Sequence, residues 1–202
     1  MIKIENLTVT KKALMLDYQV SNPFEYDIWT CDDIDIYGKD DVETRIDSET
    51  VWIKLRFNLE TNILLEEGLL AKYRSLSPGQ SHSGKILLNL PIRNASPVYD
   101  FDDDRKKHKQ VFLKCVVFEI GYFEGKHINR ISEVLEKFKS VKSSKEIQNT
   151  RFNPRIENEI QDGKSYKFLY CTNYWPGLDK EKTAKVVVTD NDIPCYVVID
   201  DK

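Results

Sequence analysis

Apolar and polar residues alternate with a period of two along most of the chain, beginning with IKIENLTV at residues 2–9. This spacing is typical of strands that bury one face and expose the other. It predicts strands at 2–9, 13–20, 26–37, 50–57, 69–75, 84–90, 111–122, 165–171, 184–189 and 195–200. Short strands of this kind fit two packed antiparallel sheets better than a parallel α/β sheet. The fold class is therefore predicted to be mainly β, with the architecture of a β-sandwich.

Turn-forming residues separate these predicted strands. The Ser-Pro-Gly sequence at 77–79 supplies a turn before the strand at 84–90, and residues 10–12 predict a tight hairpin. Pro91 lacks the amide donor that another ladder bond would need. The strand at 84–90 is therefore expected to end at Pro91 or to lie at an edge.

One segment has the spacing of a helix instead. Its apolar residues recur three or four positions apart, at Ile128, Ile131, Val134, Leu135, Phe138 and Val141. This predicts an amphipathic helix at about 127–141. A polar stretch follows the helix, so residues from about 124 to 163 are predicted to form a helical and loop insertion. Because strands resume afterwards, residues 1–202 are predicted to form a single β-sandwich domain.

The charge balance argues against a nucleic-acid partner. Thirty basic and 33 acidic residues give a formal net charge of −3. The strongest basic candidate, residues 105–109, directly follows three aspartates at 102–104, which cancel its charge locally. No segment approaches the roughly 18 consecutive apolar residues of a membrane-spanning helix, so no membrane span is expected.

The first residues and the cysteines bear on the cellular compartment. The start MIKIENLTVTKK alternates in polarity, whereas a signal peptide has a basic start and an apolar run. The protein is expected to be cytoplasmic if this is the whole chain, and extracytoplasmic if a leader has been removed. Cysteines 31, 115, 171 and 195 contain no C-x-x-C pair. They are expected to be buried reduced thiols, with a disulfide between two of them as the alternative.

A group of aspartates is a candidate calcium site: Asp32, Asp33, Asp35, Asp40 and Asp41. Calcium binds several carboxylate and carbonyl oxygens, and loops at strand ends can gather them. The spacing does not match the twelve-residue calcium loop. In the simpler interpretation, Asp33 and Asp35 alternate with isoleucines and form the solvent face of a strand. Calcium is the one cofactor that the sequence suggests.

Motifs for catalysis are missing from the sequence. The three histidines lie in polar contexts, and no nucleophile elbow accompanies them. Zinc-protease, phosphate-loop and dinucleotide fingerprints are also missing, so no catalytic residue is assigned. A pair of carboxylates for hydrolysis among the 33 acidic residues is the remaining catalytic alternative.

Aromatic residues are candidates for binding or for the core. Tyr174 and Trp175 lie where a loop is expected, and exposed rings there would contact a protein partner or a sugar. Trp29 and Trp52 are expected to fill the core between two sheets. The aromatic residues of the strand before Tyr174 are expected to share one face and to pack against the helix: Tyr166, Phe168 and Tyr170.

The stretch ALMLDYQVSNPFEYDIWTCDDIDIYG and the later stretch LSPGQSHSGKILLNLP resemble a pattern in bacterial immunoglobulin-like domains. In that pattern a strand ends in Asn before a polar turn, and a later Leu-x-Pro-Gly turn leads into a strand closed by Pro. The matching positions are Asn22, Asp35, Gly38, Leu76, Pro78, Gly79 and Pro91. The resemblance covers about the first 92 residues and implies an immunoglobulin-like sandwich that binds, adheres or inhibits. It carries over no functional residue.

The sequence therefore favours a non-catalytic binding module for a protein partner, with Tyr174 and Trp175 as candidate contacts. The first alternative is a calcium-dependent carbohydrate-binding module that uses the aspartates and the same aromatic residues. The second is a carboxylate-based hydrolase. An exposed edge strand would allow two copies to pair, and the oligomeric state is left open.

Overall fold

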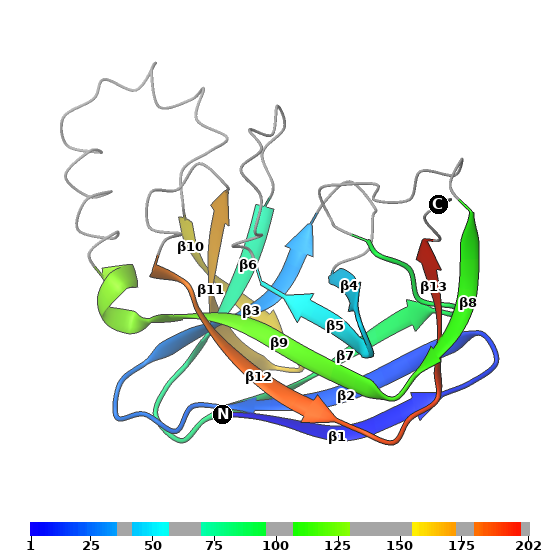
Figure 1. Ribbon diagram of the computed structural model, residues 1–202. Helices are drawn as coiled ribbons and strands as arrows, with labels where there is room; N and C mark the ends of the chain where they lie inside the picture. The colour runs from blue at the N-terminus through cyan, green and yellow to red at the C-terminus, as the bar shows by residue number, and fades with distance from the viewer. Residues whose placement is uncertain (36–41, 57–69, 96–106, 130–154, 173–179, 199–202) are drawn as a thin grey trace, which may run out of the picture.

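A computed structural model of the protein describes residues 1–35, 42–56, 70–95, 107–129, 155–172 and 180–198. Within these residues the chain forms thirteen strands (Figure 1). Their bounds are β1 Ile2–Val9, β2 Ala13–Ser21, β3 Ile28–Asp35, β4 Glu43–Asp47, β5 Thr50–Leu55, β6 Leu70–Leu76, β7 Ser81–Asn89, β8 His108–Leu113, β9 Cys115–Glu124, β10 Arg155–Gln161, β11 Lys164–Thr172, β12 Lys182–Val188 and β13 Ile193–Val198.

The strands form one small sheet, one large sheet and one isolated pair. The small sheet has the order β1-β2-β7 and lies along the bottom of the view in Figure 1. The large sheet has the order β10-β11-β6-β3-β9-β5-β4, and β12 pairs with β9 as well. Strands β8 and β13 pair with each other. The prediction of a mainly β protein is therefore confirmed.

The prediction of antiparallel pairing throughout is wrong at one position. Strand β5 runs parallel to β9, from the pair Thr50 and Cys115 to the pair Leu55 and Ile120. Strands β3 and β4 both run antiparallel to their neighbours in this part of the sheet. A two-residue turn between Asp47 and Thr50 then reverses the chain, so β5 enters the sheet in the direction of β9. The large sheet is therefore mixed.

The positions of the predicted strands are confirmed in outline, but one predicted strand is divided into two. The stretch predicted as a single strand at 111–122 is two strands, β8 and β9, separated at Lys114. They belong to different sheets, because β8 pairs with β13 whereas β9 lies inside the large sheet. Strands β4 and β10 were not predicted, and β10 lies inside the segment 124–163 that was predicted as an insertion of helix and loop.

The small sheet and the large sheet bury a common core. In β2 every second side chain is buried: Leu14, Leu16, Tyr18 and Val20. They belong to the same cluster as the buried residues of β5 and β9. The Tyr18 and Phe118 ring centroids, for example, are 4.8 Å apart. Burial along β2 therefore alternates with the same period of two as the residue types on which the strand was predicted.

Strand β9 is buried on both faces. Its residues from Val116 to Glu124 are all buried, including neighbours whose side chains point to opposite sides. On the side away from the small sheet, Phe123 packs edge-on against Tyr73 with ring centroids 4.9 Å apart. Trp29, which was predicted to be in the core, pairs with Phe123 and is 6 % exposed. A strand buried on both faces reads as a continuous apolar run, as this one does.

A helical turn follows β9 directly. Residues 125–129 are helical, and Ile128 within them is fully buried. The remainder of the helix predicted at 127–141 lies outside the described residues. No helix in the described part of the chain is long and apolar enough to cross a membrane.

A buried asparagine joins two turns that are distant in sequence. The side-chain amide of Asn22, which is 1 % exposed, donates to the carbonyls of Tyr26 and Leu76 at 2.8 and 2.9 Å. Its Oδ1 accepts from the amide of Phe24, and its own carbonyl accepts from the amide of Gly79. These bonds tie the end of β2 to the Pro-Gly turn before β7.

All four cysteines are free thiols in the structure, as the first of the two interpretations expected. Cys31, Cys171 and Cys195 are buried and Cys115 is half-buried. Burial raises the pKa of Cys195 to about 12, because the charged thiolate is disfavoured away from water.

Candidate ligand-binding groove

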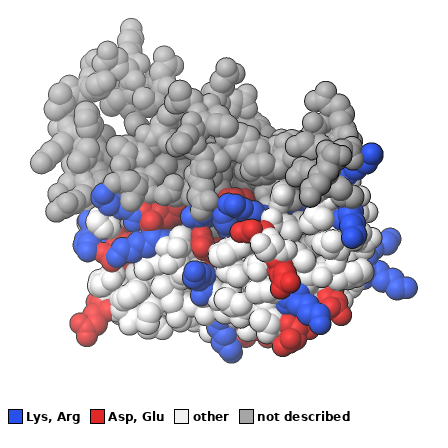
Figure 2. All heavy atoms as spheres, viewed as in Figure 1, with Lys and Arg blue, Asp and Glu red and all other residues white. Residues whose placement is uncertain are grey.

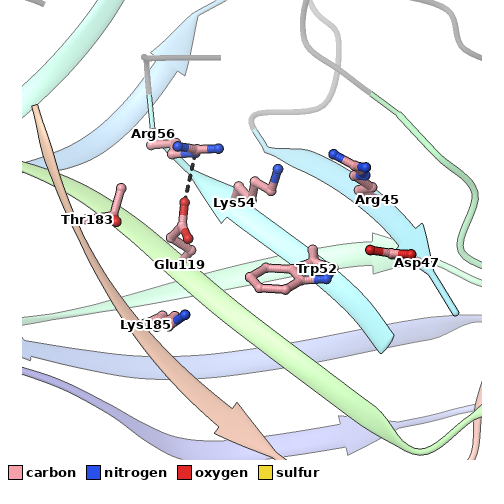
Figure 3. Close-up of a pocket in the computed structure, with 8 residues that line it drawn as sticks. All are labelled: Arg45, Asp47, Trp52, Lys54, Arg56, Glu119, Thr183 and Lys185. Carbon is pink, nitrogen blue, oxygen red and sulfur yellow. Dashed lines mark ion pairs between the residues drawn. The ribbon is translucent and has the colours of Figure 1, made fainter. Parts of the chain in front are cut away.

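An open groove of about 360 Å³ lies on the face of the large sheet that points away from the small sheet (Figure 3). Strands β4, β5, β9 and β12 supply its walls and floor. On β5 the buried residues Val51, Ile53 and Leu55 point into the core, so the residues between and after them point into the groove. Eight residues line it: Arg45, Asp47, Trp52, Lys54, Arg56, Glu119, Thr183 and Lys185.

Charges of alternating sign cross the four strands in one row at the groove. In the register of the sheet, Lys54 on β5 lies opposite Glu43 on β4 and opposite Glu119 on β9. Glu119 in turn lies opposite Lys185 on β12. Side chains directly opposite each other on neighbouring strands are close enough to interact, and opposite charges there stabilise a sheet.

The floor of the groove consists of ion pairs. Lys54 Nζ lies 3.1 Å from Glu43 Oε1, and these side chains are only 5 % and 10 % exposed. Arg56 Nε lies 2.8 Å from Glu119 Oε1, and both side chains are 11 % exposed. The dashed line in Figure 3 marks this second pair. The cations at the floor are therefore neutralised by carboxylates of the protein itself.

The opening of the groove is more positive than its floor. Arg45 and Lys185 are both exposed, and the partly exposed indole of Trp52 lies between their strands. Arg45 is directly opposite Trp52 in the sheet, and Lys185 Nζ lies 5.9 Å from the centre of the Trp52 ring. Asp47 is the exposed carboxylate among the lining residues. The prediction that Trp52 fills the core is wrong, because its side chain lies on the opposite face of β5 from the core.

Gly121 leaves room for two polar side chains, those of Glu181 and Arg56. A Cβ atom at this position would lie 2.0 Å from Glu181 Oε1 and 2.9 Å from Arg56 Cβ. Glu181 also accepts a hydrogen bond of 2.5 Å from the hydroxyl of Tyr73, which is fully buried. Burial and the nearby Glu181 carboxylate raise the pKa of Tyr73, so its hydroxyl stays protonated and donates.

Most of the predicted binding residues cannot be placed relative to this groove. Tyr174 and Trp175 are outside the described residues, as are Asp40 and Asp41. Asp32 is paired with Arg74, whose Nε lies 3.0 Å from Asp32 Oδ1. Among the described residues, no three side chains of the types that bind metals come together. The calcium site stays a prediction.

Tyr166, Phe168 and Tyr170 share one face of β11, as predicted, and cations of the neighbouring strand β6 lie over their rings. Lys72 Nζ lies 4.1 Å from the centre of the Phe168 ring, and Arg74 Cζ lies 4.7 Å from the centre of the Tyr166 ring. Such contacts between cations and rings contribute about 0.5–1 kcal/mol each at partly exposed sites. We interpret this face as a structural feature of the sheet.

The groove residues were missed in the sequence, although a signal is present. On β4 the residues Glu43, Arg45 and Asp47 alternate with Thr44 and Ile46. On β5, Trp52 and Lys54 alternate with core residues in the same way. Each pattern by itself predicts an ordinary solvent-facing strand. That β4 and β5 lie beside β9 and β12 does not follow from either pattern.

A second charged cluster surrounds Glu124 at the end of β9. Lys126 Nζ lies 2.5 Å from Glu124 Oε2, and Lys182 Nζ is bonded to Oε1. The hydroxyl of Tyr26 donates to Oε1 at 3.3 Å, and His127 Nε2 lies 3.8 Å from Oε2. Hydrogen bonds from Lys126 and Lys182 lower the pKa of Glu124 from 4.5 to about 2.

We expect this cluster to stabilise the protein in a pH-dependent manner. A carboxyl group whose pKa is lower in the folded state stabilises that state above its unfolded pKa, and the contribution is lost as the pH falls toward the folded pKa. Because the lysines are 71 % and 50 % exposed, solvent screens the pairs. Glu124→Gln should therefore cost only about 1 kcal/mol at pH 6. Urea unfolding at pH 6 and pH 2.5 should show this difference between wild type and variant shrinking in acid; a constant difference would contradict the assignment.

Charges are mixed over the face of the molecule shown in Figure 2, where basic and acidic side chains of the described residues intermingle. The positive character of the groove opening is therefore a local property of Arg45 and Lys185.

Comparison of the chain with protein-family models, with curated proteins and with solved structures gives no match.

Proposed function

We propose that this protein is a non-catalytic binding module that holds an acidic segment of a partner protein in the groove formed by β4, β5, β9 and β12. One observation carries the proposal. Two exposed cationic side chains, those of Arg45 and Lys185, lie on either side of the Trp52 indole at the opening of the groove. The opening thus combines two cations with an aromatic surface that is partly exposed to solvent.

The composition of the opening favours a protein as the ligand. Tryptophan and arginine are enriched among the residues that contribute most to protein–protein binding. An indole offers a large apolar surface, and a guanidinium binds a carboxylate through two parallel hydrogen bonds. An extended peptide could place an acidic side chain against Arg45, a second against Lys185 and an apolar group on Trp52. A groove of about 360 Å³ accommodates a few side chains of this size.

We also propose an immunoglobulin-like arrangement of the sheets. The contacts of Asn22 support it, because they connect Leu76 and Gly79, two other positions of the resemblance in the sequence. The function itself rests on the groove and not on the fold.

Titration calorimetry with the full chain and an acetylated hexaglutamate peptide tests the proposal at low salt. The wild type should bind the peptide, and Arg45→Glu/Lys185→Glu should weaken binding at least about tenfold, because two attractive charges become repulsive. The control is Lys11→Glu/Lys164→Glu, which makes the same change in net charge at two exposed positions outside the groove, one in a turn and one at the start of β11. This control should bind as the wild type does.

Two results would reject the proposed function. The first is equal affinity of the wild type and the groove variant for hexaglutamate. The second is binding of oligogalacturonate, an acidic glycan, without binding of hexaglutamate, which would assign the groove to carbohydrate instead.

A further inference from the structure

Within the described part of the chain, β10 is the outermost strand at one end of the large sheet. It is the first strand in the sheet order and pairs with β11 along its whole length; among the described residues no strand pairs with its other side. Its apolar side chains are exposed, with Ile156 at 40 % and Ile160 at 80 %. Unpaired edges with exposed apolar residues are the positions where sheets pair with further strands.

The hairpin between β10 and β11 decides which backbone groups are free at this edge. Gln161 and Lys164 close a two-residue turn in which Asp162 and Gly163 both have positive φ, 51° and 73°. Residues that flank such a turn bond to each other, and the bonding alternates along the strands. The amides and carbonyls of Ile156, Asn158 and Ile160 therefore point away from β11 and toward a strand that would add there.

We propose that two copies of this protein pair through β10, antiparallel, about a twofold axis at Asn158. This register places Ile156 opposite Ile160 of the second copy, and Ile160 opposite its Ile156. All four isoleucines then lie on one face, around the two asparagines at the axis. The exposed apolar residues of one copy are thus covered by the same residues of the other.

On the other face of β10, this register places carboxylates opposite each other, an arrangement that is unfavourable unless the carboxylates are already neutralised. Arg155 Nε lies 2.6 Å from Glu157 Oε1, and Lys72 Nζ lies 2.8 Å from Glu159 Oε2. The four charges cancel in pairs within each copy. Glu157 therefore faces the Glu159 of the second copy when both carboxylates already have a cationic partner. Arg155, half-exposed, lies diagonal to that Glu159, within reach of a long side chain.

This dimer does not depend on the function proposed for the groove. Strands β10 and β4 are at opposite ends of the sheet order, so pairing through β10 leaves both grooves open. A dimer with two grooves would bind a partner with repeated acidic segments more tightly than a single copy does.

Sedimentation equilibrium of the full chain tests the proposal over a range of concentrations. The wild type should have the mass of two chains at about 100 µM, and Ile156→Lys/Ile160→Lys should weaken the dimer at least about 50-fold, because the edge would carry facing lysines. The matched control is Leu87→Lys/Val187→Lys, which replaces apolar residues that are 63 % and 56 % exposed on other strands. It should dimerise as the wild type does. A monomeric wild type, or a dimer that survives the β10 change, overturns the proposal.

Cysteine cross-linking tests the register separately from the strength of the dimer. With diamide as oxidant, Asn158→Cys should form a disulfide between two copies, because the Cα atoms of such a pair are about 5.5 Å apart. Gln161→Cys should form no such disulfide, because position 161 lies on the same strand but opposite Arg155 of the second copy. Cross-linking at 161 rather than 158 would overturn the register.

Discussion

Lys54→Met should lower the free energy of unfolding by about 3 kcal/mol, because removal of one partner of a buried ion pair leaves the other charge uncompensated. In the wild type, the ammonium of Lys54 lies 3.1 Å from the carboxylate of Glu43, which is 8 % exposed. In the variant this buried carboxylate has lost its cation. Methionine keeps most of the length of lysine, so the loss of charge is the main change. Urea unfolding at neutral pH measures the effect.

A double-mutant cycle separates the ion pair from simple packing. Lys54→Met/Glu43→Met should recover about 2 kcal/mol of the loss, because a buried pair can be replaced by apolar residues at little net cost. The control is Lys85→Met, which breaks a pair with Asp17 whose side chains are 64 % and 32 % exposed. That change should cost less than about 0.5 kcal/mol. Equal costs for the two lysines would show that the row of charges under the groove does not stabilise the sheet.

Gly84→Ala should destabilise the protein by about 2–3 kcal/mol, since overfilling a packed site forces side chains or backbone to shift. Gly84 lies opposite Tyr18 in the pairing of β2 and β7, and the tyrosine ring lies directly over it. A Cβ atom at Gly84 would lie 2.3 Å from both Cζ and the hydroxyl oxygen of Tyr18. The ring is 3 % exposed and packs against Phe118, so it has little room to move.

Removal of the ring should remove most of this cost. Gly84→Ala should destabilise a Tyr18→Leu background by less than about 1 kcal/mol, because the clash partner is gone. Ser83→Ala, at the neighbouring exposed position of β7, serves as the control and should have a small effect. Thermal unfolding of all four variants measures the comparison. A melting temperature of Gly84→Ala equal to that of the wild type would contradict the clash.

Strand positions followed from local patterns where burial alternates regularly along the strand. The strand predicted at 13–20 became β2 at Ala13–Ser21, because alternating burial leaves its mark on the residue types themselves. Strand β10 has only two isoleucines among polar residues. This apolar pattern is too weak to predict a strand, and the polar composition predicts a loop instead. Its Asp162-Gly163 turn was a strong hairpin signal that the interpretation of this segment overlooked.

The stretch at 111–122 shows what a strand pattern cannot decide. Its residues on both sides of Lys114 have high strand preference, so they read as one continuous strand. Strand β8 nevertheless ends at Leu113, where the chain leaves the pair that β8 forms with β13. Strand β9 then begins at Cys115 in the large sheet. Each half is stabilised by different neighbours, and neither set of neighbours is close in the sequence.

By itself, the sequence determined that this protein is mainly β, where most of its strands lie and which side chains of β2 are buried, because these properties depend on residues only two positions apart. The tertiary structure alone decided that β5 lies parallel to β9, that Trp52 faces a groove and that Lys54 lies between Glu43 and Glu119. The contacts of β5 with β9 join strands that are distant in the chain. Their register is set by the packing of the whole sheet, on which a local period of two carries no information.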